Sequence, residues 1–120
     1  MTKTYLDLLW DIKNDVERSA KELGASCDLL WEPRDLYMTP FKCTKGKSGV
    51  EIGKDGCKLF RLNADEEELE RVRRETDVLF EVAPYDLERW RKGEAPFDIE
   101  AKVPCDRELL KTLFRKLAEI

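Results

Sequence analysis

The chain has 120 residues, of which 42% are apolar and 40% are charged, and it carries a net charge of −4. A chain of this length buries enough surface to form one hydrophobic core without a metal or disulfide framework. The apolar content, with aromatic residues spread along the chain, excludes intrinsic disorder as a description of the whole. We therefore predict one folded domain over residues 1–120.

The first predicted element is a helix over residues 4–23. Apolar residues recur at helical spacing from Tyr5 to Leu23, and Gly24 follows as a C-terminal stop. Further apolar residues near the start widen the apolar face. A wide face indicates that the helix is buried on two sides or contacts a partner.

Residues 26–41 predict an irregular connection, because two prolines interrupt any regular element there. A short strand at residues 29–31 is the alternative. We expect Tyr37, Met38 and Phe41 to cover the core.

Residues 42–62 predict a β-hairpin. Apolar and polar residues alternate in its first strand, residues 54–56 supply an Asp-Gly turn, and residues 57–62 form the return strand. The earlier Gly-Lys-Ser-Gly segment at residues 46–49 is interpreted as a second turn or loop. This is the most clearly β region of the sequence.

Helices and strands alternate in the second half of the chain. Asn63 is a suitable N-cap for a helix over residues 64–75. The elements that follow are a strand at 78–82, a helix from Pro84 to Gly93, a strand at 97–103 and a helix from Asp106 onward. We therefore expect an α+β fold, in which the hairpin and two further strands form one small sheet that about four helices cover on one face.

The sequence predicts a cytoplasmic protein that does not enter a membrane. The apolar segment at residues 5–10 is interrupted by Asp7, so we expect no signal peptide, and no segment reaches the length needed to span a bilayer. In a reducing compartment the four cysteines are interpreted as thiols, at Cys27, Cys43, Cys57 and Cys105. The absence of glutamine, with abundant Glu, Lys and Arg, is typical of proteins from thermophiles.

The chain contains no histidine. This excludes Ser-His-Asp and Cys-His catalysis and every histidine-containing zinc site. The cysteine spacing does not suit a four-cysteine zinc site either, so we expect no bound metal or cofactor. Cys105 lies where a helix is predicted to begin, which lowers the pKa of a thiol, but neighbouring acidic residues oppose that effect.

One catalytic pattern remains, on the strand predicted at residues 97–103. Glu100 and Lys102 match the (D/E)-x-K part of a metal-dependent nuclease signature, in which two carboxylates hold Mg²⁺. Asp86 and Asp98 are the candidates for the second carboxylate. The competing interpretation is a solvated strand face with alternating charges, and we favour it.

The charge of the chain is unevenly distributed. Residues 42–61 carry a net charge of +4, whereas the rest of the chain carries −8. The candidate binding residues of this basic hairpin are Lys42, Lys45, Lys47, Lys54, Lys58 and Arg61. They suit a phosphate backbone or an acidic protein surface, and lysines on an edge strand also prevent aggregation.

The sequence therefore favours a small, non-enzymatic binding or regulatory module that acts through contacts with a partner protein or as a homodimer. The missing catalytic groups, the wide apolar face of the first helix and the segregated charge support this hypothesis. Nucleic-acid binding through the hairpin is the first alternative, and a metal-dependent nuclease is the second.

Overall fold

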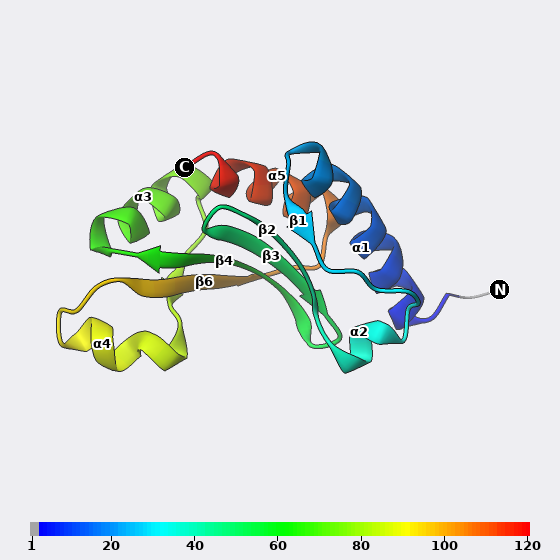
Figure 1. The fold of residues 1–120 in the computed structure, drawn as a ribbon, viewed down its shortest axis with the longest axis horizontal. Coiled ribbons are helices and arrows are strands. Elements are labelled where there is room, and N and C mark those ends of the chain that lie inside the picture. Colours follow the sequence, from blue (N-terminus) through cyan, green and yellow to red (C-terminus); the bar gives the residue numbers. More distant parts are fainter. Residues whose placement is uncertain (1–2) are drawn as a thin grey trace.

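The computed structural model describes residues 3–120, which form an arch with extents of 52 × 27 × 22 Å (Figure 1). One antiparallel sheet of six strands follows the arch. Helices α1, α3 and α5 lie along its outer side, and the shorter α2 and α4 lie at the two ends of its inner side (Figure 1). The expected α+β class, with one sheet covered on one face by the main helices, is confirmed.

The two longest helices are the ones that the periodicity predicts. Helix α1 spans Tyr5–Glu22, and the Thr4 side chain forms a capping box with Asp7 at its start. Helix α5 spans Arg107–Ala118, and at its start the side chain of Asp106 accepts the backbone N–H of Leu109. Both pack an apolar face against the sheet.

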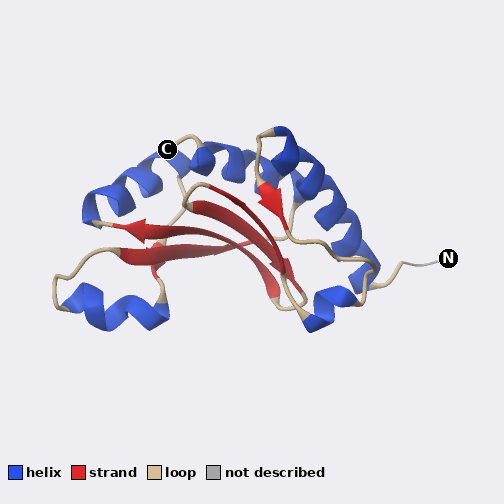
Figure 2. Cartoon of the chain, viewed as in Figure 1, coloured by secondary structure: helices blue, strands red, loops and turns tan. Residues whose placement is uncertain are grey.

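The sheet contains two more strands than expected. Its neighbours are in the order β1-β2-β3-β4-β6-β5. The bounds of these strands are Ser26–Cys27 for β1, Phe41–Lys45 for β2, Ser48–Gly53 for β3, Gly56–Ala64 for β4, Glu81–Val82 for β5 and Phe97–Val103 for β6 (Figure 2). The predicted hairpin is thus β3 and β4 of a three-stranded meander. The turn or loop predicted at residues 46–49 is a turn at 46–47 that joins β2 to β3, and Ser48 and Gly49 already belong to β3.

The connection at residues 26–41 is more regular than predicted. It begins with β1 and contains the short helix α2, Asp35–Met38, whereas no strand forms at residues 29–31. Phe41 is fully buried as expected, but Tyr37 and Met38 are exposed, because Leu36 is the side chain of α2 that turns into the core.

Helix α3 spans Glu66–Thr76 and begins two residues later than the predicted cap requires. Asp65, not Asn63, accepts the N–H of Glu68 at the helix start. Asn63 instead adopts a left-handed conformation with φ of 53°, where the pairing of β4 with β6 shifts register. Asparagine tolerates this conformation better than most residues, so its role is in the bulge.

Strand β5 contains only two of the five residues predicted at 78–82. The polypeptide then makes a single 3₁₀ turn, Pro84–Asp86, and continues into the short helix α4, Leu87–Arg91. Helix α4 has no fully buried residue, although Leu87 packs partly against the core.

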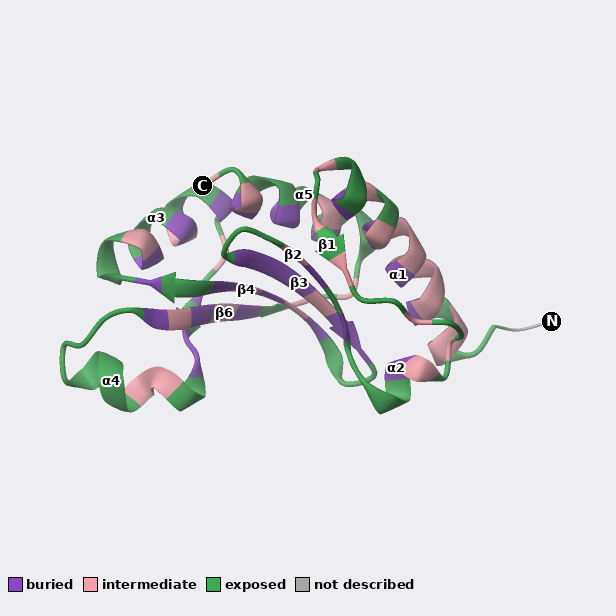
Figure 3. Ribbon diagram, viewed as in Figure 1, coloured by how far each residue is buried: buried purple, intermediate pink, exposed green. Residues whose placement is uncertain are grey.

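The two faces of the sheet differ in character, as strand β6 shows most clearly. Phe97, Ile99 and Ala101 are buried beneath the outer helices, whereas the intervening charged residues lie on the inner face (Figure 3). This alternation matches the period of a strand covered on one side. Within residues 3–120 no helix has the length and apolar character to cross a membrane.

The prediction that the four cysteines are free thiols is wrong. Cys27 is bonded to Cys43, its direct partner across β1 and β2, and Cys57 at the start of β4 is bonded to Cys105 just before α5. Sequence separations of 16 and 48 residues gave no sign of this pairing, because it depends on the register of the sheet. Because Cys105 is bonded to Cys57, it has no free thiol that could react.

Loop-closure entropy predicts what the disulfides contribute. Replacing both cysteines of a pair by serine should lower the free energy of unfolding by about 3 kcal/mol for Cys27–Cys43 and about 4 kcal/mol for Cys57–Cys105. Urea unfolding of the two double variants measures this directly. Wild-type protein in reductant should lose the sum of the two effects, and a stability insensitive to reductant would contradict the pairing.

Candidate functional site

The six basic residues predicted as a binding site do not form one surface. Arg61 points beneath the helices and is nearly buried. Its guanidinium group forms an ion pair with Glu68 and donates to Ser48 Oγ at 2.7 Å and to the carbonyls of Leu117 and Ile120 at 3.4 and 3.1 Å. Arg61 therefore holds α3 and the end of α5 to the sheet, and its charge is not offered to a ligand.

Lys47 is also paired with the carboxylate of Glu68. Its Nζ lies 3.0 Å from Glu68 Oε1 and donates to the carbonyl of Asn63 at 3.1 Å. Burial raises the pKa of Glu68, but the hydrogen bonds from Lys47 and Arg61 outweigh it, so the pKa is lower than usual. These two basic residues and one carboxylate form a structural cluster.

Lys58 belongs to a row of alternating charges on the inner face of the sheet. Its Nζ lies 2.9 Å from Glu100 Oε2 and 3.7 Å from Glu51 Oε2, and the register of the sheet places Lys42 opposite Glu51 on the neighbouring strand without an ion pair between them. The hydrogen bond to Glu100 raises the pKa of Lys58 above its usual value, although burial opposes it. This row matches the interpretation of a solvated strand face.

The other two lysines of the hairpin make contacts within the chain. The ammonium group of Lys45 donates to the carbonyl of Leu23, and Lys54 Nζ lies 5.6 Å from the centre of the Tyr37 ring. Among residues 3–120, Lys42 and Lys54 are therefore the two lysines of the hairpin whose ammonium groups form no ion pair or hydrogen bond.

The carboxylates of the nuclease hypothesis have structural partners instead of a common focus. Glu100 is paired with Lys58, and Asp98 accepts hydrogen bonds from the N–H of Asn63 and the hydroxyl of Tyr85. Asp86 accepts the backbone N–H of Asp98. Across residues 3–120 no three acidic or thiol groups come together to hold a metal ion. The geometry gives this hypothesis no support.

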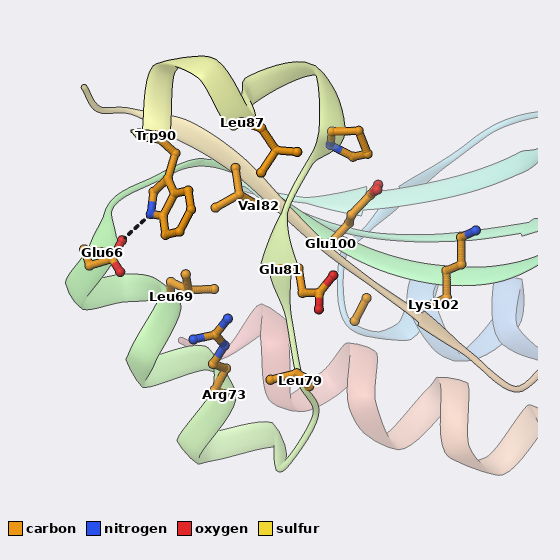
Figure 4. A pocket seen from close by; sticks show the side chains of 12 residues that line it. Glu66, Leu69, Arg73, Leu79, Glu81, Val82, Leu87, Trp90, Glu100 and Lys102 are labelled. Carbon is orange, nitrogen blue, oxygen red and sulfur yellow. Dashed lines mark hydrogen bonds between the residues drawn. The ribbon is translucent and has the colours of Figure 1, made fainter. Parts of the chain in front are cut away.

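A cleft of about 700 Å³ lies at the β5 edge of the sheet (Figure 4). This cleft is not among the sites predicted from the sequence. Its lining consists of Glu66, Leu69 and Arg73 from α3, Leu79, Glu81 and Val82 around β5, Pro84, Leu87 and Trp90 around α4, and Glu100, Ala101 and Lys102 from β6.

The walls of the cleft carry both apolar and charged side chains and are joined at one end. Leu79 is 70% exposed and Trp90 is 39% exposed, which is high for such large apolar side chains. Trp90 Nε1 donates to Glu66 Oε2 at 2.8 Å, so the hydrogen bond spans from α4 to α3 (Figure 4). Arg73 lies in the opposite wall and is fixed there by a 2.8 Å hydrogen bond to the carbonyl of Phe80.

The floor of the cleft is an incomplete sheet edge. Strand β5 pairs with β6 only at Glu81 and Val82, whereas β6 continues to Val103. The chain before β5 leaves the sheet to reach α3, so a wedge opens between it and β6. Apolar walls with a few polar groups are typical of sites that bind other molecules.

One signal in the sequence pointed to this site. Trp90 is a large apolar residue in a segment with few other apolar residues, whereas Leu79 lies in the apolar segment 78–83 and gave no such signal. No sequence pattern could show that they meet, because α3, β5 and α4 come together only through the pairing of β5 with β6.

The cluster around Arg61 predicts a pH-dependent stability. Because folding lowers the pKa of Glu68, its contribution is complete above about pH 4.3, the unfolded pKa, and is lost as the pH falls through the lower folded value. Glu68→Gln should reduce the free energy of unfolding at pH 7 by about 2 kcal/mol. The difference from wild type should shrink on acidification.

Chemical unfolding between pH 2 and pH 7 measures both effects. Glu67→Gln is the matched control, because it removes the same charge from the neighbouring, exposed position of α3. An equal loss in both variants, or a difference that does not change with pH, would contradict this role of Glu68.

Comparisons of this chain with models of protein families, with curated proteins and with solved structures found no match. The chemistry of the cleft is therefore judged from its own residues.

Proposed function

We propose that this protein is a small, non-enzymatic binding module that holds a segment of a partner protein in the cleft between α3, α4 and the β5–β6 edge. The observation that carries this proposal is the gathering of exposed apolar side chains, above all Leu79 and Trp90, around an incomplete sheet edge. Burying such side chains against a partner is favourable by about 25 cal/mol per Å² of apolar surface.

The arrangement favours a protein ligand over the alternatives. The cleft is bordered by both acidic and basic residues and so lacks the positive field that a nucleic acid requires. The hairpin lysines, which carried the nucleic-acid hypothesis, are mostly engaged within the chain. A second copy of this chain is the alternative protein ligand, and it would make the protein a homodimer.

We also propose that the protein works in the cytoplasm of a thermophile. Disulfides normally persist in oxidising compartments, but the cytosolic proteins of hyperthermophiles are rich in them. The two disulfides and the lack of glutamine are therefore both consistent with the cytoplasm of a thermophile. An oxidising compartment outside the cytoplasm is the alternative that the disulfides favour.

A selection of displayed random octapeptides on the immobilised protein tests the cleft. Fluorescein-labelled copies of the enriched peptides should bind the wild type in fluorescence anisotropy. Leu79→Asp should weaken this binding at least tenfold, because a charge on the cleft wall must be desolvated by the bound peptide.

Leu29→Asp is the matched control. Leu29 is 67% exposed against 70% for Leu79, so the same substitution is equally tolerated by the fold but lies near α2. Its binding should equal that of the wild type. If Leu29→Asp weakened binding and Leu79→Asp did not, the binding surface would lie near α2 and the proposal would be wrong.

Titration of labelled single- and double-stranded DNA and RNA tests the nucleic-acid alternative. The protein-binding proposal expects no saturable anisotropy change at low salt. Saturable binding that weakens steeply with salt and is lost in Lys42→Glu/Lys54→Glu would restore the alternative. These two lysines form no ion pair, so their reversal separates binding from folding.

A further inference from the structure

The edge of β6 beside the cleft carries unpaired backbone groups. The N–H of Ala83 donates to the carbonyl of Asp98 at 2.9 Å. In an antiparallel pair every second residue of a strand directs both its N–H and its C=O to the same neighbour. Asp98, Glu100 and Lys102 therefore direct these groups toward the β5 side.

Strand β5 does not extend far enough to meet the last of these residues. Its pairing begins at Glu81, opposite Glu100, so Lys102 faces the wedge where the chain has left the sheet. No loop or side chain among residues 3–120 makes a hydrogen bond to the backbone of Lys102 on this side. One donor and one acceptor of the sheet thus open into the cleft.

We propose that an extended segment of a different protein completes this edge by pairing with β6 at Lys102. This inference rests on the proposed function and specifies how the cleft holds its partner. An added strand satisfies the free N–H and C=O of Lys102, and the alternation of a strand then fixes which side chains of the partner meet which surface.

The chemistry of the partner follows from the two faces of β6. The partner residue opposite Lys102 lies on the inner face, and Lys102 forms no ion pair there, so an acidic residue is favoured. Its two neighbours turn to the other face, where Leu69 and Ala101 line the cleft, so they are apolar. Glu81 and Glu100 stand side by side along the same edge, which disfavours further acidic residues.

The charge of Lys102 disfavours a second copy of this chain as the partner. A two-fold axis that pairs two β6 edges through these groups places Lys102 opposite Lys102, with Cα atoms about 5.5 Å apart. Like charges directly opposite one another destabilise a strand pair. The edge therefore suits a partner of complementary charge.

Charge reversal on both sides of the contact tests the inference. Each enriched octapeptide is synthesised with its acidic residue and with lysine in its place, both labelled with fluorescein. The acidic peptides should bind the wild type about tenfold more tightly than their lysine versions, and Lys102→Glu should invert this preference. Lys42→Glu, on the same face of the sheet but far from the cleft, should leave it unchanged.

Amide exchange gives a second measurement that does not depend on charge. Binding of the acidic peptide should slow exchange of the Lys102 amide in nuclear magnetic resonance spectra, because the N–H gains an acceptor. An unchanged exchange rate in a saturated complex would overturn strand pairing.

The remaining outcomes separate this inference from the proposed function. Peptides whose affinity depends on Leu79 but not on the charge of residue 102 would overturn strand pairing and keep the cleft as the binding site. A selection that enriches no peptide would overturn both. A protein that is dimeric in light scattering, with the Lys102 amide already protected, would overturn the inference by assigning the edge to a second copy.

Discussion

The arch depends on one buried cation, the guanidinium group of Arg61. Arginine has five donors, no acceptor and a charge that proteins do not remove, so it is stable beneath helices only where enough oxygens surround it. Glu68, Ser48 and two carbonyls at the end of α5 supply them. Because these groups come from α3, β3 and α5, the arginine fixes two helices on the sheet at once.

The position of α3 then decides the shape of the cleft. The helix begins soon after β4 and is held by Glu68, so its C-terminal end lies away from the sheet edge that the chain must next join. The connection to β5 crosses this gap, which leaves two residues for pairing with β6. An unpaired edge is usually a liability for a protein in solution. Here the free part of the edge is short and carries the exposed charge of Lys102, an arrangement that limits self-association.

Charge in this protein is used mainly to hold elements together. Lys47 in the turn before β3 and the basic residues of β4 meet carboxylates that lie elsewhere in the sequence, such as Glu68 on α3 and Glu100 on β6. The segregation of charge along the sequence therefore becomes pairing in space. Lys13 on α1 is a further case, since its ammonium group is buried between the Trp10 and Phe41 rings and paired with Glu17 at 2.8 Å.

The sequence by itself determined the elements whose pattern is local. The helices at residues 5–22 and 107–118, the strand at 97–103 and the hairpin of β3 and β4 from Val50 onward follow from apolar periodicity and from capping residues, which act within a few residues. Strand β2 was not identified, because its pairing with β1 and β3 defines it more than its own composition does. Only the tertiary structure decided the disulfide partners, the contacts of the basic residues and the cleft. Each of these joins residues that are far apart in the chain, and their meeting depends on the register of the sheet and on where α3 is held.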